Sequence, residues 1–179
     1  MQGSSAALRL PTVATRVELI MPGRAPAAAD VFIADLPHQG RTAIALAVAA
    51  LLDSDAAFVP ARGPDGAIVL VGKAALAAVA VSLHEPEPAA EPDPRQEFDW
   101  EEPSEVRMLY DQRHDLEVEL DRGPTLVGQL LYSSAAERPR VVDHLNQAGG
   151  FFQLWTRDTL YVIGKRHVVR VRELVGEDS

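Results

Sequence analysis

Strict alternation of apolar and acidic residues marks the segment 116–120, which reads Leu-Glu-Val-Glu-Leu. A period of two residues is typical of a strand with one buried face. Residues 121–124, Asp-Arg-Gly-Pro, have the composition of a turn, and residues 125–132 resume a strand pattern. The pattern therefore predicts a β-hairpin over 116–132.

A helix is predicted over residues 138–147, because Val141, Val142 and Leu145 recur at helical spacing and a glycine pair follows. Three segments rich in β-branched and aromatic residues come next, at 151–156, 159–163 and 168–174. The predicted order in the second half of the chain is strand, strand, helix, strand, strand, strand.

The first half is predicted to repeat this order with a more apolar surface. Its helix, residues 42–52, is apolar on all faces, so we expect it to be covered all round. Its last segments, 67–71 and 76–81, lack polar alternation, as strands buried on both faces do. We expect the first half to be mainly structural and the second half, with a charged last strand, to present the binding face.

Matching residues recur in the same order in both halves, and the spacing between partners only shortens along the chain, as a duplicated domain predicts. The partners are Val17-Glu18-Leu19 with Val118-Glu119-Leu120, Gly23 with Gly123, Arg41 with Arg140, Leu46 with Leu145, Phe58 with Phe152, Gly72-Lys73 with Gly164-Lys165, and Val79 with Val171. Two copies are too few for a solenoid. The expected fold class is α+β, mainly β, with two tandem small β-barrel-like domains.

The predicted domain boundaries are an N-terminal tail at 1–15, copy 1 at 16–83, a linker at 84–106 and copy 2 at 107–175. Most of the formal net charge of −9 lies in the linker, which is also rich in proline. Such a composition favours an extended acidic spacer. Phe98 and Trp100 lie within it, and two aromatic side chains in a charged tether are candidates for a docking motif.

The composition argues against several classes of site. The chain has no cysteine, and its five histidines are scattered, so we expect neither a disulfide nor a metal. The start lacks a secretory signal pattern and no apolar run is long enough to span a membrane, so we expect a cytoplasmic protein without membrane contact. No nucleophile, base and orienting group can be assembled and no phosphate-binding glycine loop is present, so we expect no enzymatic activity and no cofactor.

Two stretches of the second half resemble Sm-like proteins. Gly123-Pro-Thr-Leu126-Val-Gly128-Gln-Leu130 is similar to their Gly-x-x-Leu-x-Gly-x-Leu hairpin. Val162-Ile-Gly164-Lys165-Arg166-His167-Val-Val-Arg170-Val171 resembles their second motif, a basic turn between the last two strands. The resemblance implies a small five-stranded, SH3-like barrel in which Lys165, Arg166 and His167 lie near the turn that contacts RNA.

The leading hypothesis is a non-enzymatic protein-interaction adaptor or regulatory scaffold, with a protein partner and with a homodimer if the helix 42–52 is left uncovered. The alternative is a module that binds single-stranded RNA or a small anion through the basic turn and last strand of copy 2. Its candidate residues are Lys165, Arg166, His167, Arg170, Arg172 and Trp155.

Overall fold

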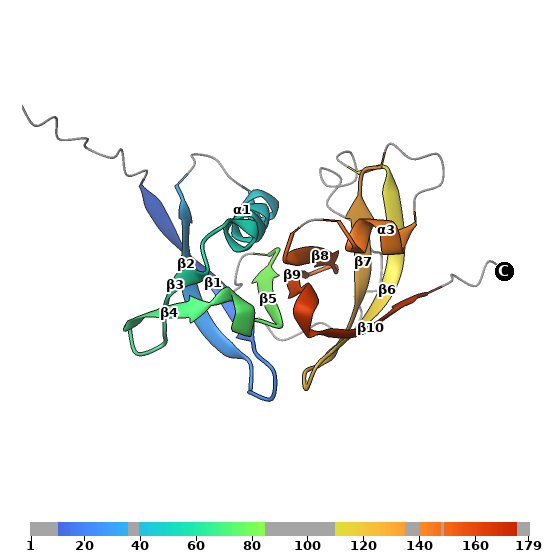
Figure 1. Ribbon diagram of the computed structural model, residues 1–179. Coiled ribbons are helices and arrows are strands. Elements are labelled where there is room, and N and C mark those ends of the chain that lie inside the picture. The colour runs from blue at the N-terminus through green and yellow to red at the C-terminus, as the bar shows by residue number, and fades with distance from the viewer. Residues whose placement is uncertain (1–10, 36–39, 85–109, 135–139, 148, 175–179) are drawn as a thin grey trace, which may run out of the picture.

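The computed structural model describes residues 11–35, 40–84, 110–134, 140–147 and 149–174. These residues form one ten-stranded antiparallel sheet with two α-helices and two short 3-10 turns, so the mainly β character is confirmed. Figure 1 shows the first half (residues 11–84) and the second half (residues 110–174) side by side. Most of the predicted linker, with Phe98 and Trp100, lies outside the described residues.

The two halves contain the same elements in the same order. The first half comprises β1 (Thr12–Ile20), β2 (Ala27–Ala34), α1 (Arg41–Asp53), β3 (Phe58–Arg62), β4 (Ile68–Gly72), a 3-10 turn (Lys73–Ala75) and β5 (Ala78–Ser82). The second half comprises β6 (Gln112–Leu120), β7 (Thr125–Tyr132), α3 (Val141–Leu145), β8 (Phe151–Trp155), β9 (Thr159–Gly164), a 3-10 turn (Lys165–His167) and β10 (Val168–Glu173). The predicted order of strands and helices is confirmed in both halves.

The strands of each half also lie in the same spatial order. Across the sheet the order is β10-β6-β7-β8-β9-β5-β1-β2-β3-β4. Each half is thus a five-stranded unit whose fifth strand pairs with its first, and β9 pairs with β5 to join the units. Because β9 is a fourth strand and β5 a fifth strand, the two units are joined head to tail.

Strand pairing assigns different partners to two of the residue matches made from the sequence. Gly72 lies opposite Phe58, and Gly164 lies opposite Phe151, so Phe58 corresponds to Phe151 and not to Phe152. In the same way Leu19 lies opposite Val79, as Val118 lies opposite Val171. Leu19 therefore corresponds to Val118, two positions from the predicted match. Side chains two residues apart share one face of a strand, which is why this shift does not show in the hydrophobic pattern.

Helix α1 covers the junction between the halves. Its buried residues are Ala45, Val48, Ala49 and Leu52. The core beneath it combines first-half residues with Trp155, Leu160 and Val162 from the second half. The expectation that this helix is covered all round is wrong, because Ala50 is exposed and several neighbouring residues are only half-buried. The uncovered side of α1 consists largely of alanine, which exposes little apolar area to water. The helix is therefore stable with only one face packed on the sheet.

The expectation for the last strands of the first half is confirmed at β5 and wrong at β4. Ala78, Val79 and Val81 are buried on β5, which has β1 on one side and β9 on the other. On β4, by contrast, Ile68, Val69 and Leu70 are 63%, 50% and 70% exposed. The difference arises because β4 is the last strand of the sheet, so no described strand pairs with its outer edge.

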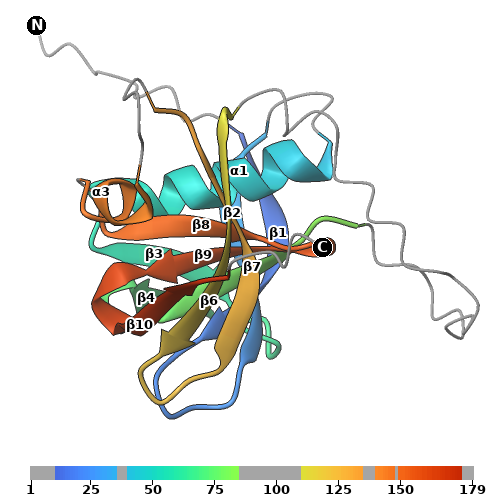
Figure 2. The same cartoon turned by 90° about the vertical axis from the view of Figure 1, so that its right-hand side faces the viewer.

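Both helices lie on the same side of the molecule, and the turns of the β1–β2 and β6–β7 hairpins lie at the opposite end (Figure 2). The two turns are in contact, since the Gly23 N–H donates to the carbonyl oxygen of Arg122 at 2.8 Å. None of the helices in the described part of the chain is long and apolar enough to cross a membrane.

Candidate functional site

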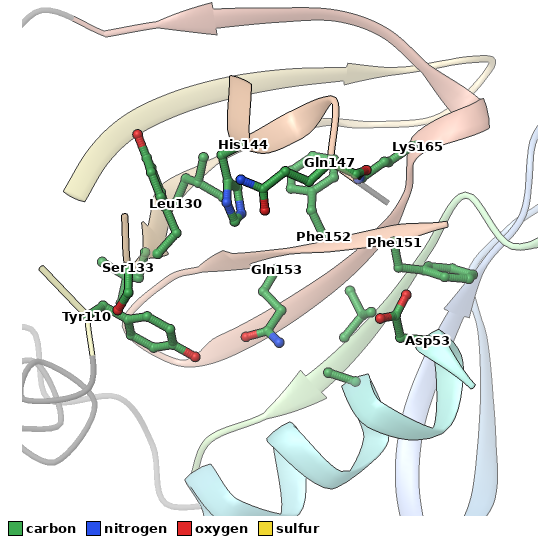
Figure 3. Close-up of a pocket in the computed structure, with 14 residues that line it drawn as sticks. Asp53, Tyr110, Leu130, Ser133, His144, Gln147, Phe151, Phe152, Gln153 and Lys165 are labelled. Carbon is green, nitrogen blue, oxygen red and sulfur yellow. The ribbon is translucent and has the colours of Figure 1, made fainter. Parts of the chain in front are cut away.

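A pocket of about 260 Å³ opens at the junction of the two halves. Side chains from the end of α1, from β7, β8 and α3 and from the turn after β9 line it (Figure 3). Its polar lining residues are Asp53, Tyr110, Tyr132, Ser133, His144, Gln147, Gln153 and Lys165. Both halves contribute to the pocket, since Ala49 and Asp53 belong to the first half and the other lining residues belong to the second.

His144 forms one wall of this pocket. Its ring stacks on Tyr132, with 4.3 Å between the ring centroids, and its Nδ1 is buried without a hydrogen-bond partner among the described residues. Burial lowers the pKa of His144, and the charge of Lys165 lowers it further. The imidazole is therefore neutral at neutral pH and does not serve as a cationic ligand for an anion.

Tyr132 connects this wall to a second histidine. Its hydroxyl lies 3.3 Å from His114 Nε2, and His114 Nδ1 lies 2.6 Å from Glu173 Oε1. Burial raises the pKa of Tyr132, and the carboxylates of Glu173, Asp111 and Asp143 raise it further. A phenol held neutral in this way orders the wall of the pocket and does not ionise at neutral pH.

Lys165 has a structural role that the sequence does not reveal. Its Nζ donates to the carbonyl oxygen of Gln147 at 2.9 Å, just beyond the end of α3. Its counterpart Lys73 donates to the carbonyl oxygen of Ser54 at 2.6 Å, just beyond the end of α1. Carbonyl groups near a helix C-terminus lack intrahelical donors, and a lysine there satisfies them. Both lysines thus fasten a helix end to the sheet.

The other predicted binding residues are dispersed. Arg170 pairs with Glu119 at 3.1 Å, and Arg172 pairs with Glu117 at 2.7 Å, so carboxylates of β6 neutralise the charges of β10. His167 Nε2 lies 2.8 Å from the carbonyl oxygen of Ala74 in the first half. Arg166 is exposed.

Trp155 is buried in the core beneath α1, where no base could stack on it. The structure therefore does not bring the candidate residues of the described part together in one basic groove.

One serine, histidine and aspartate lie close together at the end of β5. His84 Nε2 is 2.9 Å from Asp158 Oδ1, but Ser82 Oγ donates to the backbone carbonyl of His84 and does not contact its ring. A nucleophile must reach the base nitrogen for this chemistry, so the group is a strand-end contact. In the described ranges, no three His, Asp or Glu side chains are grouped so that they could hold a metal ion.

The most exposed apolar surface lies on β3 and β4. Phe58 is 59% exposed. In the pairing of β3 with β4, Phe58 lies opposite Gly72 and Pro60 lies opposite Leu70. Because residues two apart share one face of a strand, Phe58, Leu70 and Ile68 lie on the same face of the sheet. Strand β4 carries no charged residue. An uncharged edge strand with free backbone groups is a ready acceptor for another strand. We call Phe58, Ile68, Val69 and Leu70 the apolar edge.

The opposite end of the sheet differs. Strand β10 carries Arg170, Arg172 and Glu173, and its pairing with β6 shifts register between Val168 and Arg170. Strand β10 therefore differs from β4 in carrying charges, and its irregular pairing is confined to the start of the strand, before Arg170. Sequence reasoning missed the apolar edge because an apolar run looks the same in a central strand and in an edge strand.

Comparisons of the chain with protein-family models, curated proteins and solved structures give no match. The resemblance of residues 123–130 and 162–171 to Sm-like proteins therefore stays a prediction, and the case for function depends on the geometry.

Proposed function

We propose that this protein is a non-enzymatic interaction scaffold built from two copies of one small barrel-like β domain. The duplication is supported by the common element order and by the common strand order of the two halves. It is supported further by the Gly-Lys pairs, because Lys73 and Lys165 bind a carbonyl beyond a helix end in each half. A shared detail of this kind is expected of copies of one domain.

The apolar edge is the proposed docking surface, and its exposure is the observation on which the function depends. Monomeric proteins seldom leave neighbouring large apolar side chains in water, and such patches mark sites of association. An extended segment of a partner would add to β4 through backbone hydrogen bonds, while its side chains pack on Phe58 and Leu70. We propose in addition that the protein is cytoplasmic and that the molecule bound at the apolar edge is a protein.

Photo-cross-linking in the source cell tests the proposal. A photoreactive residue replaces Leu70 on the apolar edge or, as the matched control, Val127. Val127 is also exposed and apolar, but it lies on β7, which is an inner strand of the sheet. We expect protein adducts from position 70 and few from position 127. Equal adducts at both positions, or none, would contradict the proposed docking surface.

Binding of single-stranded RNA or a small anion by copy 2 has less support. The arginines of β10 are paired with glutamates of β6, and Lys165 holds a backbone carbonyl. Binding of RNA that falls steeply with salt and is lost in Arg166→Ala would favour this alternative over the scaffold.

A further inference from the structure

The junction between the halves shows how a fourth strand joins a fifth strand in this fold. Strand β9 pairs with β5 along five residues, with Val162 opposite Val79. On one face of this pair, Leu160 and Val162 are buried and Phe151 packs beside them, all in the core beneath α1. The fourth strand therefore contributes its apolar face to the core of the neighbouring unit.

The apolar edge is the counterpart of that face. By strand pairing, Gly72 corresponds to Gly164 and Phe58 to Phe151. Counting back along each strand from its glycine, Leu70 corresponds to Val162 and Ile68 to Leu160. The residues that are buried at the internal junction thus have exposed counterparts on β3 and β4.

Gly164 and Gly72 show that the internal junction is closely packed and that the equivalent position on β4 is open. A Cβ on Gly164 would lie 2.5 Å from the carbonyl oxygen of Leu76, so the backbone that leads into β5 approaches too closely for any side chain. A Cβ on Gly72 would meet only the ring of Phe58, at 3.5 Å, which is an ordinary contact. Among the described residues of one chain, no close contact requires a glycine at position 72. A strand that approaches β4 as β5 approaches β9 would require it.

At the other end of the sheet, a groove lies where a strand equivalent to β9 would pack. A groove of about 600 Å³ lies beside β10 and α3. Its apolar lining residues are Val141, Val142, Leu145 and Val171. Val171 corresponds to Val79, which faces β9 in the internal junction, so this groove is the counterpart of the space that β9 fills beneath α1. Val169, on the same strand, is 61% exposed.

We propose that the partner of the apolar edge is a second copy of this chain, and that β4 of one copy pairs with β10 of the next in the register of β9 with β5. Leu70 then lies opposite Val171, and Val69 lies opposite Arg172. Arg172 keeps its ion pair with Glu117 while its aliphatic stem covers Val69. The contact is heterologous, so repeated pairing builds a ring if the rotation closes and a filament if it does not. This inference rests on the proposed docking function of β4.

Disulfide trapping tests the register, and the chain has no cysteine of its own. Chains carrying Val69→Cys are mixed with chains carrying Arg172→Cys under mild oxidation. The control mixture uses Leu70→Cys, which is one residue away and on the opposite strand face. We expect about tenfold more linked dimer from the first mixture, because directly opposite residues have the Cβ separation that a disulfide needs. Equal yields from both mixtures would overturn the register.

The single variants exclude a different arrangement. Two β4 strands could pair with each other, and Val69→Cys alone would then form as much linked dimer as the mixture. That result would overturn the pairing of β4 with β10. Linkage within one chain cannot occur, because each variant carries a single cysteine and the chain has none of its own.

Sedimentation of the full-length chain provides an independent test. We expect the wild type to assemble with rising concentration, and Gly72→Ala to raise the dissociation constant about tenfold or more through a backbone clash. The variant should unfold at the wild-type denaturant concentration, because its own chain has room for the methyl group. A monomeric wild type, or a variant that assembles equally well, would overturn the inference. Adducts from position 70 to a different protein would then still support docking at β4.

Discussion

Lys73 is buried and donates its Nζ to both oxygens of Ser54, to the backbone carbonyl at 2.6 Å and to Oγ at 2.9 Å. Ser54 is the C-cap of α1, and its hydroxyl also donates to the carbonyl oxygen of Leu51 at 2.7 Å. One lysine on the sheet therefore holds the end of the helix that covers the junction of the two halves. Burial lowers the pKa of Lys73, and the nearby Asp53 and Asp55 oppose that shift.

Replacing this lysine should destabilise the protein. Lys73→Met keeps most of the side-chain volume but leaves the Ser54 carbonyl without its donor, so we expect a loss of about 1–3 kcal/mol in the free energy of unfolding. Urea denaturation measures the loss. Lys165→Met is the matched control, since Lys165 makes the corresponding bond at a more exposed position. A larger loss in the control would contradict the assigned role.

A methyl group at the internal junction should also be destabilising. Gly164→Ala places a Cβ against the carbonyl oxygen of Leu76, and relief of the clash requires β5 and β9 to move apart. We expect a loss of about 1–3 kcal/mol in the free energy of unfolding, as for other overpacked sites. Gly72→Ala has room and should leave the stability of the monomer unchanged. Equal stability of the two variants would show that the backbone at Leu76 can move away from position 164 at no cost in stability.

The first half should not be a stable monomer by itself. Residues 10–83 end with β5, whose outer edge is covered by β9 in the complete chain, and the core beneath α1 lacks Trp155, Leu160 and Val162 in the fragment. We expect the isolated fragment to aggregate or to lack a cooperative thermal transition, whereas the full chain unfolds cooperatively. A soluble, monomeric and cooperatively folded fragment would contradict the dependence of the first-half core on residues of the second half.

Acid should destabilise the protein partly through His144. Its pKa in the folded state is lowered from 6.5, so the unfolded chain binds a proton more readily below that value and stability falls with the pH. His144→Gln removes this contribution. The variant should therefore lose less unfolding free energy than the wild type between about pH 7.5 and about pH 5.5, as measured by urea denaturation at each pH. An identical pH dependence would show that the imidazole is not desolvated.

The local elements could be predicted because their signals are local. Alternation over residues 116–120 and a turn at 121–124 specify a hairpin without reference to the remaining chain. The predicted order of strands and helices along the chain follows from such signals. The helix in the second half is predicted over residues 138–147, whereas α3 covers Val141–Leu145, which contains all the apolar residues of that segment. Residues 138 and 139 lie outside the described residues.

The candidate site was much less predictable. Lys165 looked like a ligand for RNA, and only its distance to Gln147 shows that it binds a helix end. Trp155 looked like a stacking platform, and only the position of β8 beneath α1 shows that it belongs to the core. Residue type indicates which interactions a side chain can make, but the partner that it meets depends on chain segments far away in sequence.

The sequence by itself determined the kinds of element, their order and the repetition of that order, because hydrophobic period and turn composition act over a few neighbouring residues. Only the tertiary structure decided which strands end the sheet. The segments 67–71 and 76–81 are similarly apolar, yet one is an exposed edge and the other is the centre of the molecule. That difference arises from backbone hydrogen bonds between β5 and β9, which every residue type except proline can form and which therefore leave almost no trace in the sequence.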